Sequence, residues 1–149
     1  HKWADIEHLI REGCETIQLG YKPDVVVGVK SGGAFIANYV ANCLGVRDVG
    51  YMKASHYSHK SKSIALTLTQ MSQEAVIKEP CMIDVAGKRV LLVDDQVATG
   101  ASLRVAQKHI EEKGAADVRT YCLFAKDPAL VNYFTTRGLG VYFPWGKDA

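Results

Sequence analysis

Apolar positions recur at helical spacing near the start of the chain, from Ile6 to Ile17. This spacing predicts an amphipathic helix, and Asp5 is expected to cap it by accepting hydrogen bonds from its first free amides. Residues 25–29 then form a short β-branched run, which is typical of a strand buried on both faces. The first part of the chain is therefore expected to place a helix before a central strand.

Helical spacing returns from Ala34 and is expected to end at Gly45, a residue suited to the left-handed conformation that terminates helices. A strand is expected over residues 49–53. The polar stretch 54–79 has no strong period, and we expect a hairpin or a mobile excursion there.

A second strand-loop-helix unit begins with the apolar run 89–93. Its helix is expected to start near Ser102 and end near Gly114, and a final strand is expected over residues 118–125. Strands that alternate with helices need crossover connections. The pattern therefore predicts an α/β fold with a doubly wound, mainly parallel sheet, formed by a single domain over residues 1–149.

Two carboxylates and a loop of small residues follow the second buried strand. Asp94 and Asp95 stand where oxygen atoms can accept hydrogen bonds from a sugar diol and help to hold a hard cation. The amides and hydroxyls of residues 98–102, at the start of a helix, suit an anion such as phosphate. A diol, a cation and a phosphate together describe a phosphorylated ribose, although the same residues would also make an ordinary strand-ending turn and helix cap.

Residues 90–102 resemble the signature with which type I phosphoribosyltransferases bind phosphoribosyl pyrophosphate (PRPP). The resemblance implies that Asp94 and Asp95 are catalytic residues that hold the ribose hydroxyls and Mg²⁺. It assigns the 5′-phosphate to five consecutive residues: Ala98, Thr99, Gly100, Ala101 and Ser102. The implied activity is Mg²⁺-dependent transfer of the phosphoribosyl group from PRPP to a nucleobase, with release of pyrophosphate. Neither a Walker loop nor a GxGxxG motif occurs, which argues against nucleotide hydrolysis and dinucleotide oxidoreduction.

The loop after the first strand resembles the pyrophosphate-binding loop of that family. Its residues are Lys30, Ser31, Gly32 and Gly33, and the resemblance implies a cis peptide between Lys30 and Ser31. Without the motif at residues 90–102, the same glycines would indicate a tight strand-to-helix turn equally well. The excursion 54–79 takes the place of the family's mobile catalytic loop, with Tyr57 as a candidate contact.

The C-terminal part of the chain resembles the base-binding region of the small 6-oxopurine enzymes. Lys126 would select an exocyclic oxygen and so favour hypoxanthine, guanine or xanthine, although a strand-end lysine in water is the plain alternative. A short C-terminal hood would cover the base with Val141, Tyr142 and Phe143.

Three positions depart from the 6-oxopurine pattern. Ala98 replaces the usual aspartate that acts on the purine N7 proton, Gly140 replaces an aromatic residue, and Gly146 replaces an acidic one. These departures leave two alternatives open: an enzyme for another base such as adenine or uracil, and a regulator that senses PRPP or a nucleotide on the same fold.

Composition narrows the choice of partners. The 149 residues carry 18 basic and 16 acidic side chains, a net charge of +2, which argues against a dedicated nucleic-acid binder. The sequence shows no apolar run of about 18 residues and no positively charged leader followed by an apolar stretch, so neither a membrane span nor a secretion signal is expected, and no membrane partner. Four widely spaced cysteines suggest buried, reduced thiols and a cytoplasmic location. The expected partners are PRPP, a nucleobase and further copies of the chain, as a homodimer or homotetramer.

Overall fold

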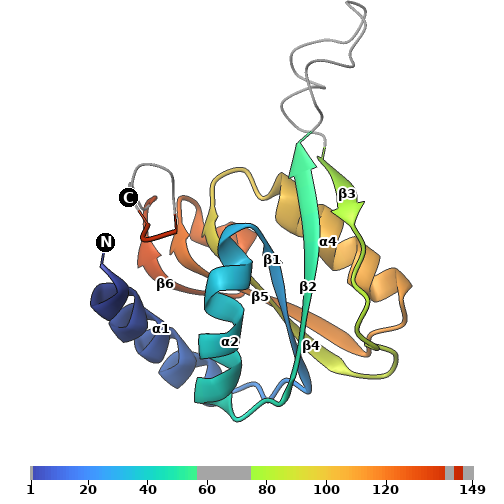
Figure 1. Cartoon of the computed structure of the whole chain (residues 1–149), viewed down its shortest axis with the longest axis horizontal. Helices are drawn as coiled ribbons and strands as arrows, with labels where there is room; N and C mark the ends of the chain where they lie inside the picture. The colour runs from blue at the N-terminus through green and yellow to red at the C-terminus, as the bar shows by residue number, and fades with distance from the viewer. Residues whose placement is uncertain (1, 57–74, 140–142, 146–149) are drawn as a thin grey trace, which may run out of the picture.

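The computed structural model describes residues 2–56, 75–139 and 143–145. Within these ranges a six-stranded sheet has helices on both faces (Figure 1). The strands are β1 (Val25–Lys30), β2 (Asp48–His56), β3 (Ala75–Glu79), β4 (Arg89–Val97), β5 (Asp117–Ala125) and β6 (Tyr133–Arg137). The helices are α1 (Trp3–Gln18), α2 (Gly32–Leu44) and α4 (Ala101–Glu112), with a 3₁₀ turn, η2, at Pro128–Leu130.

The strand order is β3-β2-β1-β4-β5-β6. All neighbouring strands are parallel except β2 and β3, which are antiparallel. From β1 the chain crosses through α2 to β2, which lies next to β1 on one side. The strand β4 lies next to β1 on the other side, and β5 and β6 follow it outward. The doubly wound, mainly parallel sheet expected from the sequence is confirmed, and its strand order reverses between β1 and β4. In such sheets, ligands bind at this switch point, beyond the carboxyl ends of the strands.

The apolar side chains of the sheet are divided between two cores. Val26, with Leu91 and Val93, faces α1 and α2, whereas Val25 and Val27 face α4. Figure 1 shows the corresponding arrangement, with α1 and α2 on one face of the sheet and α4 on the other. Burial of both faces explains why β1 is an almost continuous run of valines.

Three cysteine thiols lie inside these cores. Cys14, Cys81 and Cys122 are buried, and Cys43 is partly exposed. Burial raises the pKa of all three buried thiols, to about 12 for Cys14 and Cys122. Such thiols are poor nucleophiles at neutral pH and act as packing groups.

Some boundaries differ from the sequence-based expectations. Asp5 does not cap α1 at its first position, because the helix already begins at Trp3. Instead, Asp5 Oδ2 accepts a hydrogen bond from the Lys2 backbone amide at 3.1 Å. The helix α2 starts at Gly32, two residues earlier than expected. The sheet also continues beyond the expected final strand, into β6.

The expected excursion 54–79 begins and ends as strand. The strand β2 reaches His56, and β3 pairs with it in antiparallel register, as in a hairpin. Residues 57–74 lie outside the described residues.

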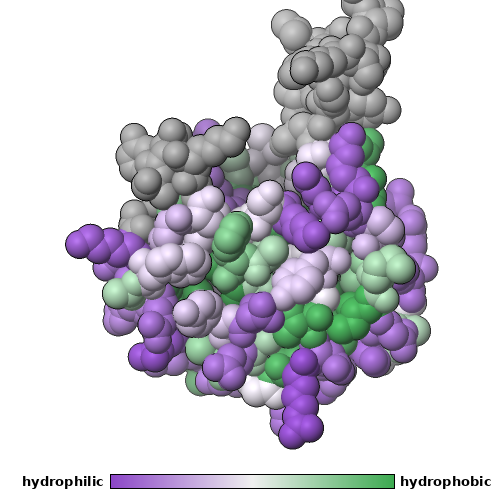
Figure 2. All heavy atoms as spheres, viewed as in Figure 1, coloured by the Kyte–Doolittle hydropathy of each residue, from purple (hydrophilic) through white to green (hydrophobic). Residues whose placement is uncertain are grey.

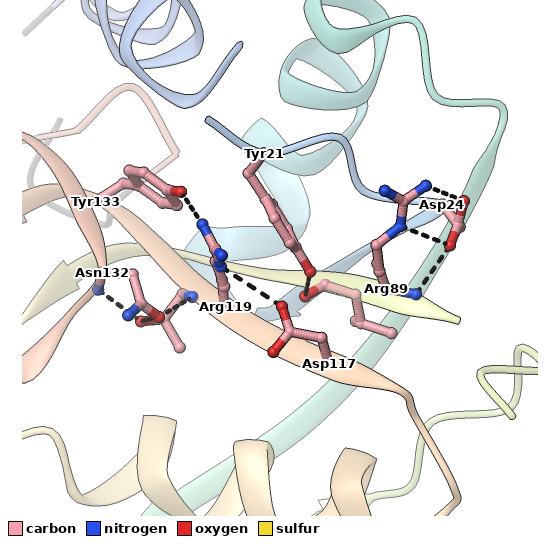
Figure 3. Close-up of polar contacts among 9 residues, drawn as sticks. Tyr21, Asp24, Arg89, Asp117, Arg119, Asn132 and Tyr133 are labelled. Atoms are coloured by element: carbon pink, nitrogen blue, oxygen red, sulfur yellow. Dashed lines mark hydrogen bonds and ion pairs between the residues drawn. The ribbon is translucent and has the colours of Figure 1, made fainter. Parts of the chain in front are cut away.

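A polar network ties the strands together at their amino ends, opposite the ends that carry the candidate site (Figure 3). Arg89 bonds the Asp24 carboxylate, with Nη2 at 3.2 Å from Oδ1. Arg119 lies over the Tyr21 ring, 4.3 Å from its centroid, and donates to the Tyr133 hydroxyl at 2.6 Å. This end of the sheet therefore has a structural role.

The face formed by α1 and α2 carries apolar and aromatic side chains among strongly hydrophilic ones (Figure 2). Phe35 and Tyr39 of α2 are 46% and 44% exposed. None of the helices in the described part of the chain is both long and apolar enough to span a lipid bilayer.

Candidate functional site

A cavity of about 350 Å³ opens at the carboxyl ends of β1 and β4. The β1–α2 loop lines one side of it and the β4–α4 loop lines the other. The lining residues are Val29, Lys30, Ser31, Gly32, Ala54, Asp94, Asp95, Gln96, Val97, Ala98, Thr99, Gly100, Ala101, Ser102, Leu103 and Leu139. The structure thus brings together two motifs that are more than 60 residues apart in the sequence, at the point where the strand order reverses.

The β1–α2 loop is pressed against the end of β4. The Lys30–Ser31 peptide is cis, as the family resemblance implies. A Cβ atom added to Gly33 would overlap the Val93 carbonyl oxygen, and one added to Gly32 would overlap the Asp95 carboxylate. Glycine is therefore required at both positions by close packing, which leaves the loop backbone open toward the cavity.

The two carboxylates at the end of β4 are fixed by backbone amides. Asp94 accepts from the Asp95 amide at 2.8 Å, and Asp95 Oδ1 accepts from the Gln96 amide at 2.7 Å. Burial, and next the negative charge of Asp95, raise the pKa of Asp94 well above its usual value. A cation or several hydroxyl donors at this place would offset the cost of the buried charge.

The loop before α4 is shaped for an anion. Gly100 is left-handed at φ 79° and stands at the amino end of α4, where unpaired amides and the helix dipole favour negative charge. Thr99 Oγ1 accepts from the Ala101 amide at 3.3 Å. Arg104 Nη1 donates to the Thr99 carbonyl at 3.0 Å, which braces the loop and adds positive charge.

Lys30 belongs to the cavity lining, and its side chain is engaged by β3. Its ammonium lies 2.9 Å from Glu79 Oε1, with both side chains about half exposed. A ligand phosphate in the cavity would compete with Glu79 for this ammonium.

The candidate base-binding residues are only partly placed around the cavity. Lys126 follows β5, and its amide donates to the Val97 carbonyl at 3.0 Å. Its side chain is exposed and does not belong to the cavity lining given above. Phe143 is buried, with its ring edge-on to Phe124 at 5.7 Å and stacked on Trp145 at 4.7 Å. Tyr57, Val141 and Tyr142 lie outside the described residues.

Sequence reasoning missed three contacts of the site. Gln96 lines the cavity, and its Oε1 atom is buried without a hydrogen-bond partner among the described residues. Trp145 Nε1 donates to Asp95 Oδ2 at 3.3 Å, and Arg104 braces the anion loop. The position of Arg104 four residues after Gly100, in the first turn of a helix, is a signal that sequence could have given; the Trp145 contact has no local signal.

The donor set fits a hard divalent cation. Asp94 and Asp95 supply only oxygen ligands, and the described part of the chain holds no group of three or more His, Cys, Asp or Glu side chains that would form a complete protein cage. Mg²⁺ commonly takes one or two carboxylates and completes its coordination with water and substrate phosphates.

Comparison with known proteins decides the family. The sequence model of the phosphoribosyl transferase domain matches residues 2–131. The chain belongs to this family. A purine phosphoribosyltransferase from Pyrococcus horikoshii superimposes with a TM-score of 0.79 at 26% identity, over 97% of this chain and 91% of that one. A hypoxanthine phosphoribosyltransferase from Staphylococcus aureus shares the fold, with a TM-score of 0.68 at 19% identity, over 91% and 73% of the two chains.

Relatives in this phosphoribosyl transferase family differ in what they do. An adenine phosphoribosyltransferase from Sinorhizobium medicae is 28% identical over 82% of this chain. The transcriptional regulator GfcR from Methanoculleus marisnigri is 27% identical over 78% of it. The chain spans 66% of the length of the former and 52% of the latter.

Proposed function

We propose that this protein is a Mg²⁺-dependent phosphoribosyltransferase that transfers the 5-phosphoribosyl group from PRPP to a ring nitrogen of a purine. The observation that carries the proposal is the single cavity shared by the Gly32 loop and the Asp94–Ser102 segment. One loop suits a pyrophosphate and the other suits a sugar phosphate, with two carboxylates between them.

Each part of the cavity has a distinct role in this proposal. Asp94 and Asp95 hold the ribose hydroxyls, and the amides and hydroxyls of residues 98–102 anchor the 5′-phosphate at the positive end of α4. The amides from Lys30 to Gly33 receive the pyrophosphate as it leaves. Catalysis is then largely a matter of positioning and of stabilising charge at the sugar C1.

Asp94 and Asp95 are also the residues that would hold Mg²⁺. When bound, the ion supplies positive charge that neutralises the pyrophosphate leaving group. Burial raises the pKa of Asp94, so its charged form needs a nearby cation or hydroxyl donors, which bound Mg²⁺ and PRPP would provide.

The choice of base follows from Lys126 in this proposal. Its backbone amide donates to the Val97 carbonyl, so the residue stands beside the end of β4. A lysine ammonium there would favour an exocyclic oxygen over an amino group. Hypoxanthine, guanine and xanthine are therefore favoured over adenine.

The test is to incubate the protein with PRPP, Mg²⁺ and each nucleobase in turn, and to follow nucleotide formation. We expect turnover with at least one 6-oxopurine. Lys126→Ala should reduce the preference for oxo over amino purines, and an unchanged preference would remove Lys126 from the base pocket.

A second candidate function is regulation. Ala98 takes the place of the usual acidic residue, and the chain resembles a transcriptional regulator over 78% of its length. A regulator should bind PRPP or a nucleotide in calorimetry and yet turn over no base. Calorimetry and turnover together separate the two functions.

The proposal also covers location and assembly. The three buried thiols are compatible with a reducing compartment, the cytoplasm.

The exposed aromatic side chains on α2 support association with a second copy, as a homodimer or homotetramer. Sedimentation equilibrium should show a mass of two or four chains, and a monomer at all concentrations would refute the assembly.

A further inference from the structure

Trp145 joins the C-terminal segment to the carboxylate of Asp95. Its Nε1 donates to Asp95 Oδ2 at 3.3 Å, although the two residues are 50 positions apart. The other oxygen, Oδ1, accepts from the Gln96 amide at 2.7 Å. Each oxygen of this carboxylate therefore has its own donor, and the two donors define its orientation.

The indole of Trp145 is itself held on both sides. It stacks on Phe143 at a centroid distance of 4.7 Å and on Phe35 at 5.4 Å, with both rings within 9° of parallel. Trp3 contacts the same indole in a tilted arrangement at 5.5 Å. The two stacked rings, from α2 and the C-terminal segment, thus set where the indole N–H points.

Asp95 is confined from the opposite side by Gly32. A Cβ atom at Gly32 would overlap all three outer atoms of the Asp95 carboxylate, so the backbone of α2 lies directly against it. The carboxylate is accordingly held between the start of α2, the backbone of β4 and the indole. A side chain fixed before the ligand arrives loses little rotamer freedom on binding.

We propose that Trp145 is a positioning residue for the PRPP site: it acts through Asp95, which it holds in the orientation that binds the ribose diol. This inference rests on the proposed function. It means that the C-terminal segment completes the ribose-binding half of the cavity, in addition to its expected part in covering the base.

The matched pair Trp145→Phe and Trp3→Phe tests this role. Both variants keep an aromatic ring at the substituted position, but only the first removes a donor to Asp95. Hydrogen bonds to charged groups contribute enough that we expect the Kd for PRPP, with Mg²⁺, to rise about 10-fold in Trp145→Phe. We expect it to stay within about 2-fold in Trp3→Phe, because no donor to Asp95 is lost.

A second measurement shows whether the effect passes through Asp95. In an Asp95→Ala background, which offers no acceptor to the indole, Trp145→Phe should weaken PRPP binding by no more than about 2-fold, because coupled residues are non-additive. The chain has two tryptophans, so Trp3→Phe assigns the indole N–H resonance of Trp145, which should shift in Asp95→Asn.

The outcomes separate this inference from the proposed function. If the unchanged protein binds no PRPP, the proposed function fails, and the positioning role fails with it. If the unchanged protein binds PRPP but the two phenylalanine variants lose equal affinity, only the positioning role is overturned. An equal loss in the Asp95→Ala background would also overturn it.

Discussion

Gly32 lies directly against the carboxylate of Asp95, so that even a methyl group at position 32 would overlap it. The first residue of α2 is therefore packed against a side chain at the end of β4, and a larger residue at position 32 would displace the Asp95 carboxylate. Through this contact the β1–α2 loop constrains the position of a group in the β4–α4 half of the cavity.

Gly32→Ala should displace the Asp95 carboxylate and weaken PRPP binding. A shift of about 1 Å in a positioned group can lower activity by about 100-fold, and we expect an affinity loss of about 10- to 100-fold. Calorimetric titration with PRPP measures it. Gly20→Ala is the control, because a Cβ atom there meets no heavy atom within 4 Å; equal binding by the two variants would contradict the prediction.

Gly33→Ala should reduce the stability of the fold. Its Cβ atom would overlap the Val93 carbonyl, which is backbone and cannot rotate away. Overpacking of this kind typically costs about 1–3 kcal/mol, and urea denaturation should show a loss of that size in the free energy of unfolding. A variant as stable as Gly20→Ala would show that the two loops separate easily.

Gln96→Leu should stabilise the ligand-free protein and weaken ligand binding. Its Oε1 atom is buried without a partner among the described residues, and an unsatisfied buried acceptor costs about 1–3 kcal/mol. We expect a gain of about 1 kcal/mol in urea denaturation without ligand. The stabilisation that added PRPP gives should be smaller than in the unchanged protein; an unaltered ligand effect would place Gln96 outside the binding site.

Glu79→Gln should strengthen pyrophosphate binding without changing stability. It releases the ammonium of Lys30, a residue of the cavity lining. Exposed ion pairs contribute little, so the free energy of unfolding should change by less than about 1 kcal/mol, while pyrophosphate inhibition should tighten by about 2-fold. Glu7→Gln removes a comparable surface pair with Arg11 in α1 and should leave inhibition unchanged. Weaker inhibition in Glu79→Gln would instead assign Glu79 a supporting role.

The contribution of His109 to the stability of the protein should be lost in mild acid. Its Nε2 accepts from the Cys81 amide at 3.2 Å, which only the neutral ring can do. Burial, and next the charge of Lys113, lower the pKa of His109, while Glu112 acts in the opposite direction. The folded state thus favours the neutral ring, and its contribution is complete above the unfolded pKa and is lost as the pH falls through the folded pKa.

Urea denaturation between about pH 5 and pH 8 measures this contribution. Asp94, whose pKa is raised, acts in the opposite direction over the same range, so the comparison with His109→Gln isolates the histidine. On the acid side of this range, His109→Gln should lose less stability than the unchanged protein. An identical pH dependence in both proteins would contradict the assignment.

The sequence indicated the centre of the fold well because its signals there are local. The valine run of β1 and the apolar run before Asp94 are buried on both faces, and such strands are recognisable from composition alone. The Asp94–Ser102 segment was recognisable because strand, acids, glycine and hydroxyls follow one another directly in the chain.

The edges of the fold carried weaker signals. The strand β6 has only half-exposed and exposed residues and lies at the edge of the sheet, so it has no buried apolar run to mark it. The strand β4 extends to Val97 because it pairs with β5 there. The polar residues at 94–96 do not indicate this extension in the sequence. The hydrogen bond from Trp145 to Asp95 depends on tertiary packing across 50 residues, and no sequence spacing encodes it.

The central claim is that the cavity between β1 and β4 binds PRPP, and calorimetric titration of PRPP with Mg²⁺ tests it most directly. The unchanged protein and the control Asp48→Asn, at the amino end of β2, should bind one PRPP per chain with similar affinity. A variant with Asp94→Asn and Asp95→Asn should bind at least about 10-fold more weakly. Absence of binding to the unchanged protein, or equal binding by all three, would contradict the account.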